Sequence, residues 1–319
     1  MSLVIGLLIF TVISTVLLST RMLKPLKKTS LENPIPGSIS EIVTYLESSE
    51  RFSKPKPGTE KKIFFPNNQI DKAKLSFVYL HGFSASRQET SPVFETLARQ
   101  WKAPIFMTRF RGHGMGPQDL GDARQEQWIQ DALEAYQIGL TLGDEVVLAC
   151  MSTGCALGLY LGYFFPNKIR AIIMLSPNFA PADSRAFLAA GPLGPLVTKM
   201  VVGDYHEFVP TNSEQAYYWT NRYGSAVLSE MISLVTSIKN LDLEKIQIPV
   251  LTLYTPFDQV ISAPEVERNV ARLKSPHNKL VPLIETQEHV IAGNILNPKM
   301  NDRVQKEIND FLVAILERK

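Results

Sequence analysis

Cysteine and an excess of charge of one sign are both nearly missing from this chain. The 319 residues include two cysteines, Cys150 and Cys155, which are too few and too close in sequence to hold a fold by disulfide bonds. The 33 basic and 31 acidic residues give a formal net charge of +2, so no surplus of cations is available to bind a phosphate backbone. The sequence therefore disfavours a disulfide-built scaffold and predicts no nucleic-acid partner.

The short motifs of several cofactor-dependent enzyme classes are missing as well. Gly112, Gly114 and Gly116 do not form G-x-G-x-x-G, and the sequence has no G-x-x-x-x-G-K-[ST], H-E-x-x-H or C-x-x-C. Internal repeats and low-complexity tracts are also lacking. With 45% hydrophobic residues the chain can still bury a large core and an active site. We therefore expect a globular protein that uses no cofactor and no metal.

The N-terminus differs in composition from the rest of the chain. Residues 1–20 carry no charged side chain, and residues 3–18 are almost wholly apolar, long enough to cross about 30 Å of hydrocarbon as a helix. A cleaved signal peptide is the rival interpretation, but no basic residue precedes the run and no A-x-A-like site follows it. We predict a single-pass transmembrane anchor at residues 1–20.

The charges next to this run are unevenly placed. The basic residues nearest to it all follow it, namely Arg21, Lys24, Lys27 and Lys28. Positive charges collect on the cytoplasmic side of membrane spans, so this asymmetry predicts a cytoplasmic catalytic domain. The alternative is a solvated stretch without topological meaning.

Residues 21–60 are expected to form a linker and a short helix. Ser38 and Glu41 have the S-x-x-E spacing of a capping box, which predicts a helix from there to about Arg51. From residue 61 to residue 319, short apolar strand patterns alternate with longer helical patterns. This alternation predicts an α/β fold with a mainly parallel central sheet and helices on both faces.

One connection in this α/β pattern is unusually long. Residues 178–247 separate two predicted strands, whereas a strand–helix connection normally has about 2–6 residues. We expect this insertion to form a cap. Its apolar and aromatic residues, including Tyr217, Tyr218 and Trp219, would favour an acyl or other hydrophobic substrate if they faced the active site. The alternative is that they form the core of the cap itself.

A serine occupies the turn between one predicted strand and the next helix. Residues 146–165 (VVLACMSTGCALGLYLGYFF) open as a strand, turn at small residues around Ser152 and continue as a helix. This is the setting of a nucleophile elbow, where a sharp turn lifts a serine hydroxyl above the sheet. Gly154 fits the G-x-S-x-G pattern, whereas Cys150 stands in place of the first glycine. We predict Ser152 as a nucleophile, with a structural turn as the alternative.

A nucleophilic serine needs a base to accept its proton and an acid to orient that base. Only His289 follows a strand near the C-terminus; the other histidines are His81, His113, His206 and His277. Asp258 follows another strand and is the preferred acid. Asp242 lies in a helical or turn segment, and Glu285 is too close to His289 in sequence. Ordinary loop positions for His289 and Asp258 are the alternative, but the order Ser, Asp, His is that of α/β-hydrolases.

Five segments in this order resemble motifs of the α/β-hydrolase superfamily, of the serine esterase, lipase and monoacylglycerol lipase type. They are YLHGFSAS (79–86), FRGHGMG (110–116), CMSTG (150–154), YTPFDQVIS (254–262) and EHVIAGN (288–294). The resemblance covers residue 61 to the C-terminus. Two positions depart from it: Cys150 replaces a glycine, and Arg109 stands where many members have aspartate.

The resemblance implies an activity and a set of site residues. It implies a carboxylic ester hydrolase with Ser152, Asp258 and His289 as catalytic triad and with the backbone N–H groups of Phe83 and Thr153 as oxyanion hole. The expected partners are a small-molecule ester or lipid substrate and, through the N-terminal helix, the membrane. The same triad would also serve an amidase, a peptidase or an acyltransferase. An α/β-hydrolase fold without catalysis, acting as a binding module, is the alternative from another class.

Overall fold

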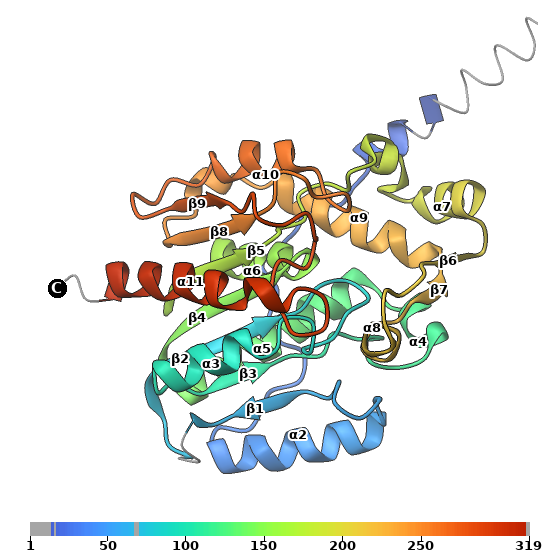
Figure 1. Cartoon of the computed structure of the whole chain (residues 1–319). Coiled ribbons are helices and arrows are strands. Elements are labelled where there is room, and N and C mark those ends of the chain that lie inside the picture. The colour runs from blue at the N-terminus through green and yellow to red at the C-terminus, as the bar shows by residue number, and fades with distance from the viewer. Residues whose placement is uncertain (1–13, 16, 67–69, 317–319) are drawn as a thin grey trace, which may run out of the picture.

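The computed structural model describes residues 14–15, 17–66 and 70–316, which form a central sheet with helices on both faces (Figure 1). The sheet has the strand order β1-β3-β2-β4-β5-β8-β9, and only β1 runs antiparallel to its neighbour. Its strands are β1 (Lys62–Phe64), β2 (Ala73–Leu80), β3 (Ile105–Met107), β4 (Gly143–Met151), β5 (Ile169–Leu175), β8 (Val250–Tyr254) and β9 (Lys279–Pro282). The predicted α/β class with a mainly parallel sheet is confirmed.

Two hydrophobic layers separate the sheet from its helices. In β4, Val146, Leu148 and Cys150 face one layer, and the alternate residues face the other. This period of two places α5 (Gln125–Leu142), α6 (Thr153–Phe164) and α10 (Ala263–Val270) on one face. Helices α3 (Val93–Gln100) and α11 (Asn301–Leu316) cover the other face. Because both faces are buried there, the central strands are apolar over residues 77–80, 146–151 and 171–175.

The order of the strands decides where a ligand can bind. Along the chain, β3 is added on one side of β2 and β4 on the other, so the direction of winding changes between β2 and β4. In open α/β sheets the crevice beyond the carboxyl ends of such a strand pair is the usual ligand site. The loop after β2 begins at His81, and the turn after β4 holds Ser152.

The segment between β5 and β8, which contains the expected cap, lies beyond the carboxyl ends of the strands (Figure 1). Its elements are the 3-10 helices η2 (Ser184–Ala189) and η3 (Leu243–Lys245), the helices α7 (Gly194–Val202), α8 (Ser213–Tyr218) and α9 (Ala226–Lys239), and the antiparallel strands β6 (Tyr205–Glu207) and β7 (Arg222–Gly224). Short helix α4 (Pro117–Gly121) packs against β7. The cap thus covers the edge at which Ser152 lies.

The chain before the sheet lies against the α5 and α6 face. The hydroxyl of Tyr160 in α6 donates to the carbonyl of Lys27 at 2.9 Å and accepts from the N–H of Thr29 at 3.2 Å. Helix α2 (Ile39–Ser53) then begins at the predicted N-cap Ser38, with both hydrogen bonds of the capping box to Glu41 formed. Residues 1–13 and 16 of the expected anchor lie outside the described residues. Within residues 14–15, 17–66 and 70–316, no helix is long and apolar enough to cross a membrane.

Candidate active site

Ser152 occupies the corner between β4 and α6 in an unusual backbone conformation. Its φ is 52° and its ψ is −118°, a sparsely populated combination that costs about 1–3 kcal/mol for a residue other than glycine. The backbone N–H of Ser152 donates to the carbonyl of Leu175 in the neighbouring strand at 2.9 Å, which holds the corner in place. Helix α6 starts at the next residue, so the hydroxyl lies at a helix N-terminus.

The glycine after the corner allows strand and helix to approach closely. A Cβ atom on Gly154 would lie 2.2 Å from the carbonyl oxygen of Leu80 and 2.6 Å from that of His81. Both contacts are to backbone and cannot be relieved by a side-chain rotation. The end of β2 and the start of α6 therefore meet here only because residue 154 has no side chain.

Cys150, the first departure from the elbow pattern, is accommodated by a second glycine. Its thiol donates to the carbonyl of Ile173 at 3.2 Å, and a Cβ atom on Gly158 would lie only 3.3 Å from its sulfur. Gly158 of α6 thus leaves room for the side chain that Cys150 adds.

Three predicted residues from separate strands meet at this corner. Nε2 of His289 lies 2.9 Å from Oγ of Ser152, and Nδ1 of His289 lies 2.7 Å from Oδ2 of Asp258. Oδ1 of Asp258 accepts hydrogen bonds from the backbone N–H groups of Val260 at 2.8 Å and Ile261 at 3.0 Å, and these bonds fix the orientation of the carboxylate. With the Nδ1 proton donated to Asp258, Nε2 is free to accept the hydroxyl proton of Ser152.

The side chains that the sequence analysis set aside lie elsewhere. Glu285 pairs with Arg303 at 3.5 Å, and Asp242 pairs with Lys245 at 3.1 Å. His206 packs on Tyr223 within the cap, with ring centroids 5.3 Å apart, and His277 is exposed. Among the acids considered, Asp258 alone contacts His289.

The loop after β2 brings Phe83 beside Ser152. A Cβ atom on Gly82 would lie 3.4 Å from Cβ of Ser152, so loop and elbow are in contact. The backbone N–H groups of Gly82 and Ser84 are bound, to Glu89 at 2.6 Å and to His113 at 3.0 Å. In the described part of the chain, the N–H groups of Phe83 and Thr153 have no hydrogen-bond partner. These are the two donors that the sequence predicted for an oxyanion.

Two buried histidines, His81 and His113, fix the conformation of this loop. Nδ1 of His81 donates to the carbonyl of Gly82 at 2.8 Å, while Nε2 accepts the N–H of Phe110 at 3.1 Å. Nε2 of His113 accepts from Ser84, so its proton lies on Nδ1 and points at the carbonyl of Arg111, 3.2 Å away. Burial lowers the pKa of His113 to about 4 and that of His81 well below its usual range. Both rings are therefore neutral at physiological pH.

Glu89 is a buried carboxyl of this site that the sequence analysis did not identify. Its Oε1 accepts the N–H of Gly82 at 2.6 Å and the hydroxyl of Tyr79 at 2.8 Å. Burial outweighs these hydrogen bonds and raises the pKa of Glu89 to about 8, so the group is protonated at neutral pH. No spacing rule reveals it, because its partners are defined by the fold.

Arg109, the second departure, also has a partner. Its guanidinium forms two hydrogen bonds of 2.8 Å with the carboxylate of Glu50 in α2. The described residues contain no group of three or more His, Cys, Asp or Glu side chains that could hold a metal ion.

Comparisons with known proteins agree with this geometry. The serine aminopeptidase S33 family model matches residues 71–294. A carboxylesterase of Bacillus subtilis is 23% identical over 248 residues, which cover 76% of this chain and 92% of that protein. An esterase/lipase candidate of Mycoplasma genitalium is 29% identical over 106 residues, so the match spans 33% of this chain and only 39% of that relative's length.

Solved structures with the same fold include lipolytic enzymes and esterases. A metagenome-derived lipolytic enzyme superposes with a TM-score of 0.66 at 17% identity, covering 81% of this chain and 98% of that one. A soluble variant of monoglyceride lipase from Saccharomyces cerevisiae superposes with a TM-score of 0.61 at 13% identity, covering 79% of this chain and 90% of that one. These structures share the fold of the chain, and the family match places the chain in the serine aminopeptidase S33 family of α/β-hydrolases; with its esterase and carboxylesterase relatives, this match identifies an enzyme of the esterase/lipase type.

Proposed function

We propose that the protein hydrolyses carboxylic esters through a covalent acyl-enzyme. Ser152 is the nucleophile, His289 the general base and then the general acid, and Asp258 the acid that orients the imidazole. The observation that carries the proposal is the pair of contacts at His289, 2.9 Å to Ser152 and 2.7 Å to Asp258. A serine, a histidine and a carboxylate in this relation can activate the hydroxyl for attack on an ester carbonyl.

The reaction proceeds in two similar halves. Ser152 attacks the carbonyl carbon while His289 takes its proton, and the oxyanion that forms is stabilised by the N–H groups of Phe83 and Thr153. The imidazolium then protonates the leaving alkoxide, which releases the alcohol and leaves the acyl group on Ser152. Water activated by His289 repeats the sequence and frees the acid. Each oxyanion donor is worth about 10²–10³ in kcat.

The surroundings of Ser152 favour an apolar acyl group. Phe83 packs edge-on against Tyr223 of the cap, with ring centroids 5.3 Å apart. Asn178, whose N–H donates to the carbonyl of Ser152 at 3.1 Å, contacts the sulfur of Met231 in α9 through its amide. Aromatic and thioether side chains of the cap thus contact Phe83 and Asn178, two residues that neighbour the nucleophile, and such surfaces suit an acyl chain or another lipid-like group.

Labelling with a fluorophosphonate tests the proposed triad. We expect stoichiometric labelling of the wild-type protein, no labelling of Ser152→Ala, and at least a thousandfold slower labelling of His289→Ala. His277→Ala, at an exposed histidine, is the matched control and should label normally. Labelling that survives Ser152→Ala would refute the assignment. A folded wild-type protein that does not label would favour the binding module.

A substrate panel separates ester hydrolysis from the other reactions of the same triad. We expect kcat/KM on p-nitrophenyl esters to rise with acyl chain length and to exceed the values on anilides of the same acids and on aminoacyl anilides. Faster cleavage of an aminoacyl anilide would favour a peptidase. Preferential formation of a new ester when glycerol is added would favour an acyltransferase.

We further propose that residues 1–20 anchor the enzyme in a membrane and that the catalytic domain is cytoplasmic. The apolar run at residues 3–18 and the basic residues after it support this. Just beyond the run, the hydroxyl of Ser19 accepts the N–H of Leu193 at 2.9 Å, beside α7. Helix α7 exposes Leu196, Met200 and Val201 by 56%, 66% and 78%. A bilayer that held the anchor would therefore lie next to apolar cap residues.

Liposome flotation of the full-length chain tests the anchor. We expect the wild-type protein to float with phosphatidylcholine vesicles even in high salt, and a chain without residues 1–20 to stay at the bottom of the gradient. Met200→Glu should leave anchoring intact. Flotation of the shortened chain would refute the anchor, and a C-terminal reporter active only outside the cell would refute the orientation.

A further inference from the structure

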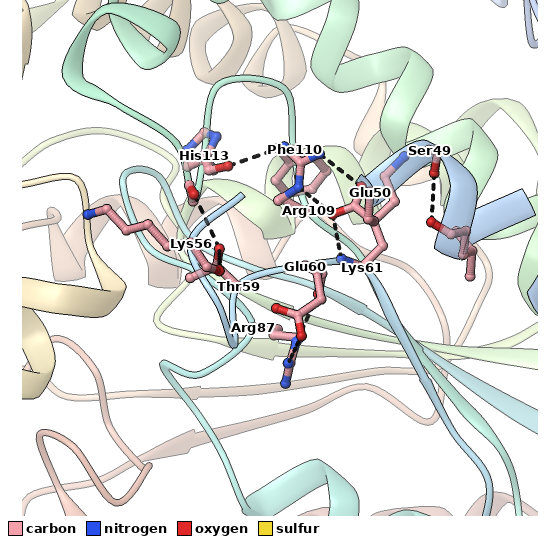
Figure 2. A network of polar contacts seen from close by, with 12 residues as sticks. Ser49, Glu50, Lys56, Thr59, Glu60, Lys61, Arg87, Arg109, Phe110 and His113 are labelled. Atoms are coloured by element: carbon pink, nitrogen blue, oxygen red, sulfur yellow. Dashed lines mark hydrogen bonds and ion pairs between the residues drawn. The ribbon is translucent and has the colours of Figure 1, made fainter. Parts of the chain in front are cut away.

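A buried ion pair connects helix α2 to the core of the enzyme. The guanidinium of Arg109 binds both carboxylate oxygens of Glu50 at 2.8 Å, and the backbone N–H of Lys61 donates to the same carboxylate at 3.1 Å (Figure 2). The side chains of Arg109 and Glu50 are only 7% and 9% exposed. The pair is thus a fixed, bidentate contact rather than a mobile surface contact.

The segment around Glu50 also holds the loop that follows β3. Arg109 donates to the carbonyl of His113 at 3.3 Å. The backbone N–H of Lys56 and the hydroxyl of Thr59 donate to the carbonyl of Gly114 at 2.7 and 3.3 Å. Figure 2 shows Glu50 next to Arg109, and Thr59 near His113. Residues 50–61 therefore define the position of residues 109–114.

That loop in turn sets the peptide plane that carries an oxyanion donor. The N–H of Phe110, the residue after Arg109, donates to His81, whose other ring nitrogen donates to the carbonyl of Gly82 at 2.8 Å. The carbonyl of Gly82 and the N–H of Phe83 belong to one trans peptide and point in opposite directions. Fixing the carbonyl therefore aims the N–H. On the other side of Phe83, His113 holds the N–H of Ser84.

We propose that Glu50 and Arg109 are positioning residues for catalysis. Through Phe110 and His81 they fix the direction of the backbone N–H of Phe83, the oxyanion donor. This inference rests on the proposed ester hydrolysis. Helix α2 precedes residues 71–294, which the family model matches, so this support comes from outside the matched region. The ion pair with Glu50 in α2 explains why arginine stands at position 109, where many family members have aspartate.

A purely structural role and a positioning role of this ion pair predict different effects on stability and on the catalytic constants. Loss of a purely structural ion pair lowers stability and leaves the catalytic constants of the folded enzyme unchanged. Loss of positioning lowers kcat at unchanged KM, because the donor acts on the oxyanion and not on the bound ester. Glu50→Gln and Arg109→Lys change the side-chain volume little but remove the bidentate charge pair, because the glutamine amide has one acceptor oxygen and the lysine ammonium has no donor fork. Glu307→Gln, which breaks the pair between a carboxylate that is only 10% exposed and Lys279, outside this network, is the matched control.

The experiment compares these variants on an ester and on the matching thionoester, at a temperature at which circular dichroism shows each to be folded. We expect Glu50→Gln and Arg109→Lys each to lower kcat on the ester about tenfold, at constant KM, as misplacing a catalytic group by a fraction of an ångström does. Sulfur is a poor acceptor for the oxyanion donors, so turnover on the thionoester should change little. The ester-to-thionoester ratio of kcat should therefore fall.

Glu307→Gln should lower the melting temperature and leave that ratio unchanged. The inference is overturned if Glu50→Gln and Arg109→Lys also change only the melting temperature, or if kcat falls equally on both substrates. Failure of the underlying function is recognised separately, because the wild-type enzyme would then show no Ser152-dependent turnover at all.

Discussion

The carboxyl group of Glu89 accepts a hydrogen bond of 2.6 Å from the N–H of Gly82, the residue directly before Phe83. A Cβ atom on Gly82 would lie 3.0 Å from Oε2 of Glu89 and 3.4 Å from Cβ of Ser152, so the carboxyl and the nucleophile face the same side of Gly82. Burial raises its pKa to about 8, so the group next to the oxyanion site is neutral at pH 7. Two predictions follow from its titration, one for stability and one for activity.

The stability of the wild-type protein should depend on pH through Glu89. The native state keeps a proton that the unfolded chain releases near pH 4.5, so the free energy of unfolding should fall as the pH rises from about 4.5 to about 8. Relative to Glu89→Gln, which cannot titrate, the fall should approach about 1.4 kcal/mol per pH unit. Urea denaturation of both proteins at pH 5, 6, 7 and 8 measures it. A constant difference between them would contradict the buried, protonated carboxyl.

The activity of the wild-type enzyme should decline above about pH 8, where Glu89 ionises. A negative charge beside Gly82 opposes the oxyanion that forms next to Phe83, so kcat should fall as the carboxylate forms. Glu89→Gln should keep its activity to higher pH. The check is a pair of pH–kcat profiles on a p-nitrophenyl ester, corrected for spontaneous hydrolysis. If kcat of the wild type and of Glu89→Gln declined identically at alkaline pH, another group would cause the decline.

Replacement of Asp258 by asparagine should reduce kcat by about 10⁴ with little change in KM. The amide would present a donor to Nδ1 of His289 or favour the wrong tautomer, so Nε2 could no longer accept the proton of Ser152. Steady-state kinetics on an ester substrate measure the loss. Asp242→Asn and Glu285→Gln, which alter acids paired with Lys245 and Arg303, should keep wild-type kcat.

Gly154→Ala should be destabilising and nearly inactive. The added methyl group would lie 2.2 Å from the backbone carbonyl of Leu80, which forces β2 and α6 apart and costs about 1–3 kcal/mol or more. The same movement would separate Thr153 from Phe83. Thermal denaturation and fluorophosphonate labelling measure both effects. Gly37→Ala is the control, since a Cβ atom on Gly37 meets nothing within 4 Å and should be tolerated.

Much of the fold could be predicted from local patterns. The strands of the central sheet and the helices α3, α5, α6 and α11 were predicted because their apolar residues recur at strand or helix spacing, and the helix at Ser38 was predicted from its capping box, whereas α10 was not predicted. The small helices α4 and α8 and the hairpin β6–β7 were not predicted, because short elements carry too few residues for a periodicity. Their conformation depends on contacts with the rest of the cap.

The catalytic candidates could be predicted because each follows a strand. Parallel strands bring their carboxyl ends to one edge of the sheet, so Ser152, Asp258 and His289 converge although 137 residues separate the first from the last. Sequence order and motif spacing were sufficient to select them. The anchor at residues 1–20 stays a prediction from composition.

The sequence by itself determined the α/β class, the family resemblance and the residues to test at the ends of the strands. Only the tertiary structure decided how those residues are supported: Glu89 beside Gly82, Gly158 opposite Cys150, and Glu50 paired with Arg109. The physical reason is that a periodic pattern records burial within one element, whereas a hydrogen bond or close contact between distant segments requires atoms to meet in space. The pKa of Glu89 arises in the same way, because desolvation exists only once the chain has folded.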